Sequence, residues 1–151
     1  MSSDATVKSH YYQDKTARLA DLLGASKVSL RDDGIDVDGR FYPIVNDVII
    51  LLAPAQYPAS LKNRLGVGLK GDKTEVFAPD IQDHYSKFWK EWPGLHSRYD
   101  EEFEGYFDLV DLSSLRGASV CDLGCGMGRW SYMLAQRAQI KELVLVDFSD
   151  A

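Results

Sequence analysis

The chain of 151 residues has few of the features that would tie it to a membrane, a metal or an oxidising compartment. It has only two cysteines, Cys121 and Cys125, and no second pair to complete a four-ligand metal site or a disulfide framework. The longest apolar run, residues 48–53, is far shorter than the roughly 20 residues of a membrane-spanning helix. The amino terminus is polar and lacks an apolar signal core. We therefore expect a cytoplasmic protein without a metal site or a membrane partner.

Basic charge is scarce in the second half of the chain. Residues 1–79 carry ten acidic and ten basic side chains, whereas residues 80–151 carry thirteen acidic and only seven basic ones. A protein that grips a nucleic-acid backbone needs a basic surface, and the second half shows no such footprint. The hydrophobic share of 45% is nevertheless that of an ordinary globular protein, so we expect a folded chain.

The most informative stretch is Val-Cys-Asp-Leu-Gly-Cys-Gly-Met-Gly-Arg-Trp, residues 120–130. An apolar run ending at Asp122 is followed by glycines at alternate positions, Gly124, Gly126 and Gly128. Glycines let the backbone turn sharply and let a ligand approach the main chain, and the helix that follows has free amides. The stretch predicts a nucleotide-type cofactor loop, with Cys125 as a small side chain beside the cofactor.

The residues around this loop read as an α/β unit. Apolar residues recur at helical spacing in residues 80–92 and 97–112, and we expect their aromatic stripes to lie in the core. The alternative is that one of these aromatic side chains lines the cofactor pocket. Strands are predicted at 119–122 and 143–147, with a helix at 128–138 between them. Because both strands are nearly continuous apolar runs, we expect them to be parallel and buried on both faces.

The first half of the chain has a different pattern. A helix is predicted at residues 6–23, followed by an antiparallel meander of short strands at 27–31, 35–37, 40–44 and 48–52. The turns between them are rich in Asp, Asn and Gly. Residues 1–53 are therefore expected to form a small α+β module. Residues 54–79 hold three of the five prolines and read as a linker, with at most one helical turn at 59–65. The α/β domain would occupy residues 80–151.

Three kinds of cofactor loop can be compared with the glycine stretch. A phosphate-binding NTPase loop needs a lysine followed by serine or threonine after its last glycine, and this chain has neither there. A dinucleotide loop, Gly-x-Gly-x-x-Gly, needs a third glycine where Arg129 stands, so an NAD-dependent oxidoreductase is a distant alternative. The third kind is the S-adenosylmethionine loop.

Asp122 with the three alternate glycines spells Asp-x-Gly-x-Gly-x-Gly, which resembles motif I of the Rossmann-like S-adenosylmethionine-dependent methyltransferases. The resemblance implies that the loop packs against the methionine part of the cofactor and that Asp122 helps to fix it. Asp147 ends the predicted second strand and is placed to accept hydrogen bonds from both ribose hydroxyls. Residues 145–149, Leu-Val-Asp-Phe-Ser, are similar to that family's second motif, in which the residue after the acid, here Phe148, borders the adenine.

This resemblance covers residues 80–151 and implies a methyltransferase with a methyl acceptor of unknown identity. A small molecule or biosynthetic intermediate is expected, because no nucleic-acid surface is visible. The family's sheet has seven strands, so we expect a truncated Rossmann-like methyltransferase domain, the first βαβ unit with its leading helices, that has no turnover alone. The candidate bases His10, His84 and His96 have no partner spacing, and no catalytic residue is assigned.

A second resemblance lies upstream. Residues 40–52, with Tyr-Pro-Ile before an apolar strand, resemble a small zinc-ribbon-like family that activates tRNA and translation-factor methyltransferases. Zinc-binding members carry paired cysteines in this region, and this chain has none, so no zinc site is carried over. The resemblance implies an accessory module, while a generic meander is the alternative. A non-catalytic activator or scaffold is accordingly the alternative function for the whole chain.

Overall fold

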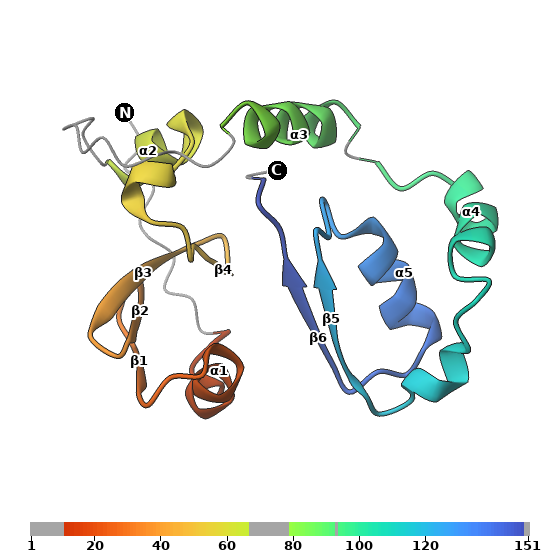
Figure 1. Ribbon diagram of the computed structural model, residues 1–151, viewed down its shortest axis with the longest axis horizontal. Helices are drawn as coiled ribbons and strands as arrows, with labels where there is room; N and C mark the ends of the chain where they lie inside the picture. Colours follow the sequence, from red (N-terminus) through yellow and green to blue (C-terminus); the bar gives the residue numbers. More distant parts are fainter. Residues whose placement is uncertain (1–10, 67–78, 93, 150–151) are drawn as a thin grey trace. The chain divides into compact units, whose positions relative to one another are not determined.

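The computed structural model describes residues 11–66, 79–92 and 94–149 (Figure 1). The chain divides into two compact units, Met1–Ala53 and Pro54–Ala151. The first contains a four-stranded sheet and the second a two-stranded sheet, and both contain helices. The prediction of a mixed α/β chain is therefore confirmed at this coarse level.

The first unit is a helix followed by an antiparallel meander. Its elements are α1 (Thr16–Leu23), β1 (Val28–Leu30), β2 (Gly34–Val37), β3 (Arg40–Val45) and β4 (Val48–Ile49), and the strands pair in chain order. The two tight turns, at 38–39 and 46–47, have positive φ at both residues, which is the geometry that asparagine, aspartate and glycine tolerate. The meander prediction is confirmed. The helix begins later than expected, because residues 11–15 form turns and residues 1–10 lie outside the described part.

A few side chains hold this small unit together. Ile35 on β2 is completely buried, and it pairs with Tyr42 on β3. The Asp38 carboxylate accepts hydrogen bonds from the amides of Ser26 and Lys27, at 3.0 and 2.8 Å, which fixes the chain between α1 and β1. Because the unit is small, its apolar core depends strongly on Ile35.

Replacing Ile35 by alanine is expected to lower the free energy of unfolding of this unit by about 2–5 kcal/mol, through lost burial and a cavity. Ile35→Val should cost only about 0.5–1.5 kcal/mol. Val48→Ala is the control, because Val48 is 57% exposed. Urea unfolding followed by circular dichroism measures all three. Equal losses for Ile35→Ala and Val48→Ala would show that Ile35 is not the centre of this core.

The second unit begins with helices and ends in a βαβ arrangement. Its elements are the 3-10 turn η1 (Pro54–Gln56), α2 (Ala59–Leu65), α3 (Pro79–Glu91), α4 (Arg98–Tyr106), the 3-10 turn η2 (Leu112–Leu115), β5 (Ser119–Leu123), α5 (Arg129–Arg137) and β6 (Glu142–Val146). β5 and β6 are parallel, with Val120 opposite Leu143 and Leu123 opposite Val146. The predicted strand-helix-strand order and the parallel pairing are confirmed.

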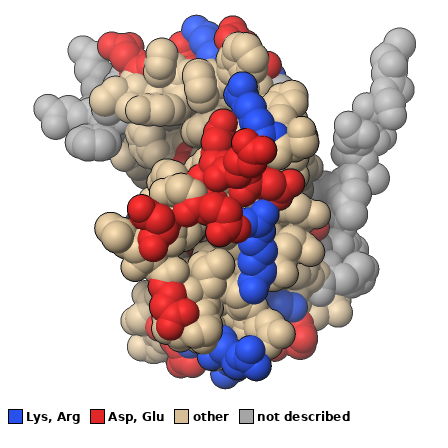
Figure 2. All heavy atoms as spheres, turned by 90° about the vertical axis from the view of Figure 1, so that its right-hand side faces the viewer, with Lys and Arg blue, Asp and Glu red and all other residues tan. Residues whose placement is uncertain are grey.

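The core of this unit lies where α4 and α5 meet. It contains Tyr99, Phe103, Met133, Leu134 and Ala138, all buried. At the surface, Arg137 of α5 binds Asp100 and Glu104 of α4, each at 2.7 Å. Figure 2 shows acidic side chains gathered on the face that it draws, with basic side chains beside them. No continuous basic patch covers this face of the described residues.

The helical turn expected at 59–65 is confirmed as α2, with Leu61 buried, and Tyr57 just before it is buried too. Residues 67–78 of the expected linker lie outside the described part. The helix expected at 97–112 ends at Tyr106, because Asp111 caps a separate 3-10 turn by accepting the amide of Ser113 at 2.9 Å.

Two expectations about burial are also wrong. On α3 the apolar stripe of Ile81, Tyr85, Phe88 and Trp92 is exposed, while the polar residues Gln82 and Ser86 are buried. β5 and β6 are not buried on both faces, and Leu123 is 76% exposed. The reason is that α5 covers one face of this pair, and no further strand pairs with it among the described residues.

Across residues 11–66, 79–92 and 94–149, no helix has the length and apolar character needed to cross a bilayer.

Candidate functional site

The glycine loop lies where the two parallel strands end. Gly124, Gly126 and Gly128 all have positive φ, at 81°, 56° and 77°, a region that glycine enters without steric cost. The amides of Gly124 and Cys125 both donate to the carbonyl of Val146, at 2.8 and 3.2 Å, which ties the start of the loop to the end of β6. In open parallel sheets, ligands bind at the carboxyl ends of the strands, so this is the edge where a site is expected.

Asp147 lies against this loop. Its Oδ2 accepts a hydrogen bond from the amide of Gly126 at 2.7 Å, and its Oδ1 accepts from the amide of Ser149 at 2.7 Å and from the Ser149 hydroxyl. The residue itself is exposed. The structure thus brings together the glycines and the carboxylate that the sequence singled out.

A second Asp-x-Ser turn in the same unit shows which of these contacts is unusual. Asp111 accepts hydrogen bonds from the amide and the hydroxyl of Ser113, at 2.9 and 2.7 Å, just as Asp147 does from Ser149. Asp111 and Asp147 therefore share an ordinary aspartate turn. What distinguishes Asp147 is its bond to Gly126, which joins the turn to the glycine loop.

Asp122, the acidic residue before the glycines, is half-buried at the end of β5. It accepts a hydrogen bond from the hydroxyl of Ser131, which is buried on α5. Sequence reasoning missed Ser131. The signal was a serine at a buried position of an amphipathic helix, where a polar group needs a partner. The contact fixes the Asp122 side chain on the face of the sheet that α5 covers.

The pKa of the Cys125 thiol depends on its burial and on the charges near the loop. Burial, together with the nearby carboxylates of Asp147 and Asp122, raises its pKa to about 11. A thiol with this pKa stays protonated at neutral pH and is a poor nucleophile or metal ligand. Two carboxylates thus impose a negative field on the loop, and Cys125 has no sign of redox or nucleophilic chemistry.

Removing the charge of Asp147 should make Cys125 more reactive. In a Cys121→Ser background, Asp147→Asn is expected to lower the pKa of Cys125 and to speed its alkylation by iodoacetamide at pH 8, because more thiolate is present. Asp147→Glu keeps the charge and should remain slow. Mass spectrometry measures both rates. Equal rates for the two variants would mean that the carboxylate charge does not act on this thiol.

An aromatic side chain from α3 covers the loop. A Cβ added to Gly126 would lie 2.6 Å from Cε2 of Trp89, so the indole packs directly on this glycine. α3 is held there by Gln82, whose Nε2 donates to the carbonyl of half-buried Phe148 at 2.9 Å. Trp89 is thus the one of the predicted aromatic residues that reaches the loop. Gln82 was missed, because its bond partner is far away in the sequence.

Gly126→Ala is expected to destabilise the second unit more than Gly124→Ala does. Alanine at positive φ costs about 1–2 kcal/mol at either position. At Gly126 the new methyl group also meets Trp89, which adds about 1–3 kcal/mol, whereas nothing lies within 4 Å at Gly124. Thermal unfolding measures the difference, and a Trp89→Ala background should abolish it. A difference that persists without the indole would rule out this contact as the cause.

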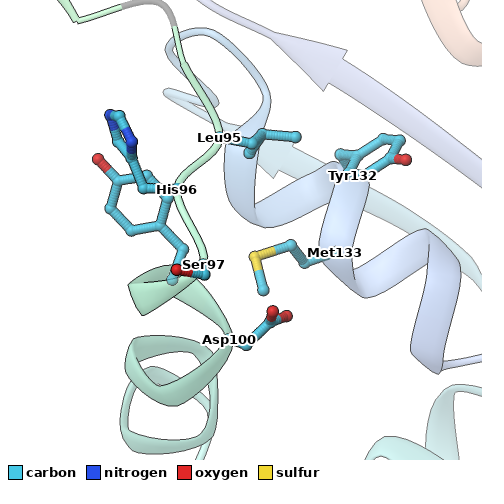
Figure 3. A pocket seen from close by; sticks show the side chains of 7 residues that line it. Leu95, His96, Ser97, Asp100, Tyr132 and Met133 are labelled. Atoms are coloured by element: carbon cyan, nitrogen blue, oxygen red, sulfur yellow. The ribbon is translucent and has the colours of Figure 1, made fainter.

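Of the candidate histidines, the structure describes His84 and His96. His96 lines a shallow pocket of about 280 Å³ between the start of α4 and α5, together with Tyr132 and Met133 (Figure 3). Asp100 also lines this pocket but is already paired with Arg137. None of the glycine-loop residues contributes to its lining. His84 packs edge-on against Tyr85, and His10 lies outside the described residues.

Within the part of the chain that the structure describes, no group of three or more His, Cys, Asp or Glu side chains is placed to hold a metal ion. Comparisons with models of protein families, with curated proteins and with solved structures give no match to this chain.

Proposed function

We propose that the second unit binds S-adenosylmethionine and that the protein is an S-adenosylmethionine-dependent methyltransferase with a Rossmann-like domain. The observation that carries the proposal is the hydrogen bond between the Gly126 amide and the Asp147 carboxylate. It places an acidic residue after β6 directly beside a glycine loop after β5. A nucleoside cofactor needs this combination. The glycine loop lets the cofactor approach the protein backbone, and the carboxylate accepts hydrogen bonds from the ribose hydroxyls.

The residues of the site fit this cofactor. Asp147 is exposed, so its carboxylate can accept the ribose hydroxyls while the Ser149 turn holds its position. Phe148 follows it and offers a flat apolar side chain for the adenine. Nothing lies within 4 Å of the place where a Cβ of Gly124 would be, which leaves room for the methionine part there, and Asp122 is held at the loop by Ser131.

Charge favours this cofactor over a dinucleotide. The carboxylates of Asp122 and Asp147 both act on Cys125, so the loop lies in a negative field. That field attracts the sulfonium and ammonium groups of S-adenosylmethionine and repels the two phosphates of NAD. Independently of charge, Arg129 stands where a dinucleotide loop has its third glycine, so the residue at this position also argues against NAD.

The cofactor supplies an activated methyl group on a sulfonium, so the protein's own task is to hold the donor, exclude water and align the acceptor. Trp89 packs on Gly126 and shields the loop from solvent. The acceptor is proposed to be a small molecule in the cytoplasm, because the face in Figure 2 is acidic rather than basic. The first unit is proposed to be an accessory module.

Isothermal titration of the whole chain with S-adenosylmethionine, S-adenosylhomocysteine and NAD tests the proposal. Micromolar binding of the first two and none of NAD are expected. Asp147→Asn should weaken binding at least about tenfold, the loss of one or two charge-assisted hydrogen bonds. Asp111→Asn is the matched control, since Asp111 makes the same serine turn without a loop contact. Absence of S-adenosylmethionine binding, or tighter binding of NAD, would refute the proposal.

A further inference from the structure

Arg129 is the first residue of α5 and follows the last glycine of the loop. Its guanidinium carbon lies 3.8 Å from the centre of the Tyr99 ring and 5.9 Å from that of Trp89, so aromatic rings flank it. Its Nη2 makes a weak contact of 3.5 Å with the sulfur of Met127. Its Nε is buried and has no hydrogen-bond partner within the described part of the chain.

This arrangement is unfavourable without a further partner. Leaving a buried donor unsatisfied costs about 1–3 kcal/mol, and more when the group is charged. No carboxylate of the described residues lies within ion-pair distance of Arg129, although acidic side chains are abundant in this unit. A buried, unsatisfied donor on a cation at the edge of a candidate site indicates an anion that the bound state supplies.

Arg98 shows what a structural arginine looks like beside the same ring. Its guanidinium carbon lies 5.1 Å from the centre of the Tyr99 ring and its Nη2 lies 3.4 Å from the Tyr99 hydroxyl. It pairs with Glu102 one turn along α4, and its side chain is 65% exposed. Ring stacking, the ion pair with Glu102 and contact with solvent therefore explain Arg98. Ring stacking does not explain Arg129, whose Nε is buried without an acceptor.

We propose that Arg129 binds the carboxylate of the methionine part of the cofactor, through Nε and one Nη. This inference rests on the proposed function and adds a residue to its site. A guanidinium presents two parallel donors that match the two oxygens of a carboxylate, a geometry that lysine cannot reproduce. The weak contact with Met127 leaves Nη2 free to turn to a better acceptor. Tyr99 and Trp89 hold the plane of the group, so little side-chain entropy is lost on binding.

The test compares two ligands that differ in one group, S-adenosylmethionine and its decarboxylated form. Calorimetric titration of the whole wild-type chain should show the carboxylate-bearing ligand binding about 10- to 100-fold more tightly, the size of a charge-assisted contact. Arg129→Gln should remove that difference and leave the affinity for the decarboxylated ligand unchanged. Arg98→Gln is the matched control and should leave both affinities as they are.

Arg129→Lys keeps the positive charge but loses the two parallel donors of the guanidinium. It should therefore weaken the binding of S-adenosylmethionine only, and by less than Arg129→Gln does. If thermal unfolding shows that Arg129→Gln is not folded, Arg129→Lys serves as the test variant in its place. Equal weakening of both ligands by Arg129→Gln or Arg129→Lys would make the residue structural and would overturn this inference, with the proposed function intact. Unchanged affinities would overturn it too. If the wild-type chain binds neither ligand, the proposed function fails, and this inference with it.

Discussion

The hydrogen bond from the Gly126 amide to the Asp147 carboxylate is the contact on which the candidate site depends. Without it the glycine loop would be tied to the Val146 carbonyl at the end of β6 but not to the Asp147 turn that follows. The bond requires positive φ at Gly126, which only a residue without a Cβ adopts at no cost, and it brings negative charge to the loop. Burial and the Asp147 carboxylate raise the pKa of Cys125, and Trp89 packs closely on Gly126 because this residue has no Cβ.

The parts of the fold that the sequence predicted are those with local signals. Turn residues with positive φ, such as Asp38 and Asn46, mark the hairpins of the meander, and the strands between them fall close to their expected places. The βαβ order followed from two apolar runs on either side of an amphipathic segment, with glycines between. The proximity of Asp147 to the glycine loop could also be predicted, because the carboxyl ends of parallel strands lie at the same edge of the sheet.

The parts that could not be predicted depend on long-range contacts. Periodicity showed that α3 has an apolar stripe but not which face packs inward, and the buried face proved to carry Gln82, Ser86 and Trp89. The bond from Gln82 to Phe148 spans 66 positions and has no local signature. Ser131 lies only nine positions from Asp122, but helical periodicity does not show which polar group it meets. A buried polar residue is positioned by its partner, and the partner is known only once the chain is folded.

The balance of charge at the loop distinguishes cofactors better than the spacing of its glycines does. The carboxylates of Asp122 and Asp147 both act on Cys125 in the loop, and the guanidinium of Arg129 follows the loop with an unsatisfied donor. A dinucleotide would place two phosphates against this set and leave the carboxylates opposed to like charge. The proposed cofactor, with a sulfonium, an ammonium and one carboxylate, has the opposite balance of charge to this set. The glycine spacing is compatible with both kinds of ligand, because it determines only where a ligand can come close to the backbone. The choice between them therefore lies with the charged side chains around the loop.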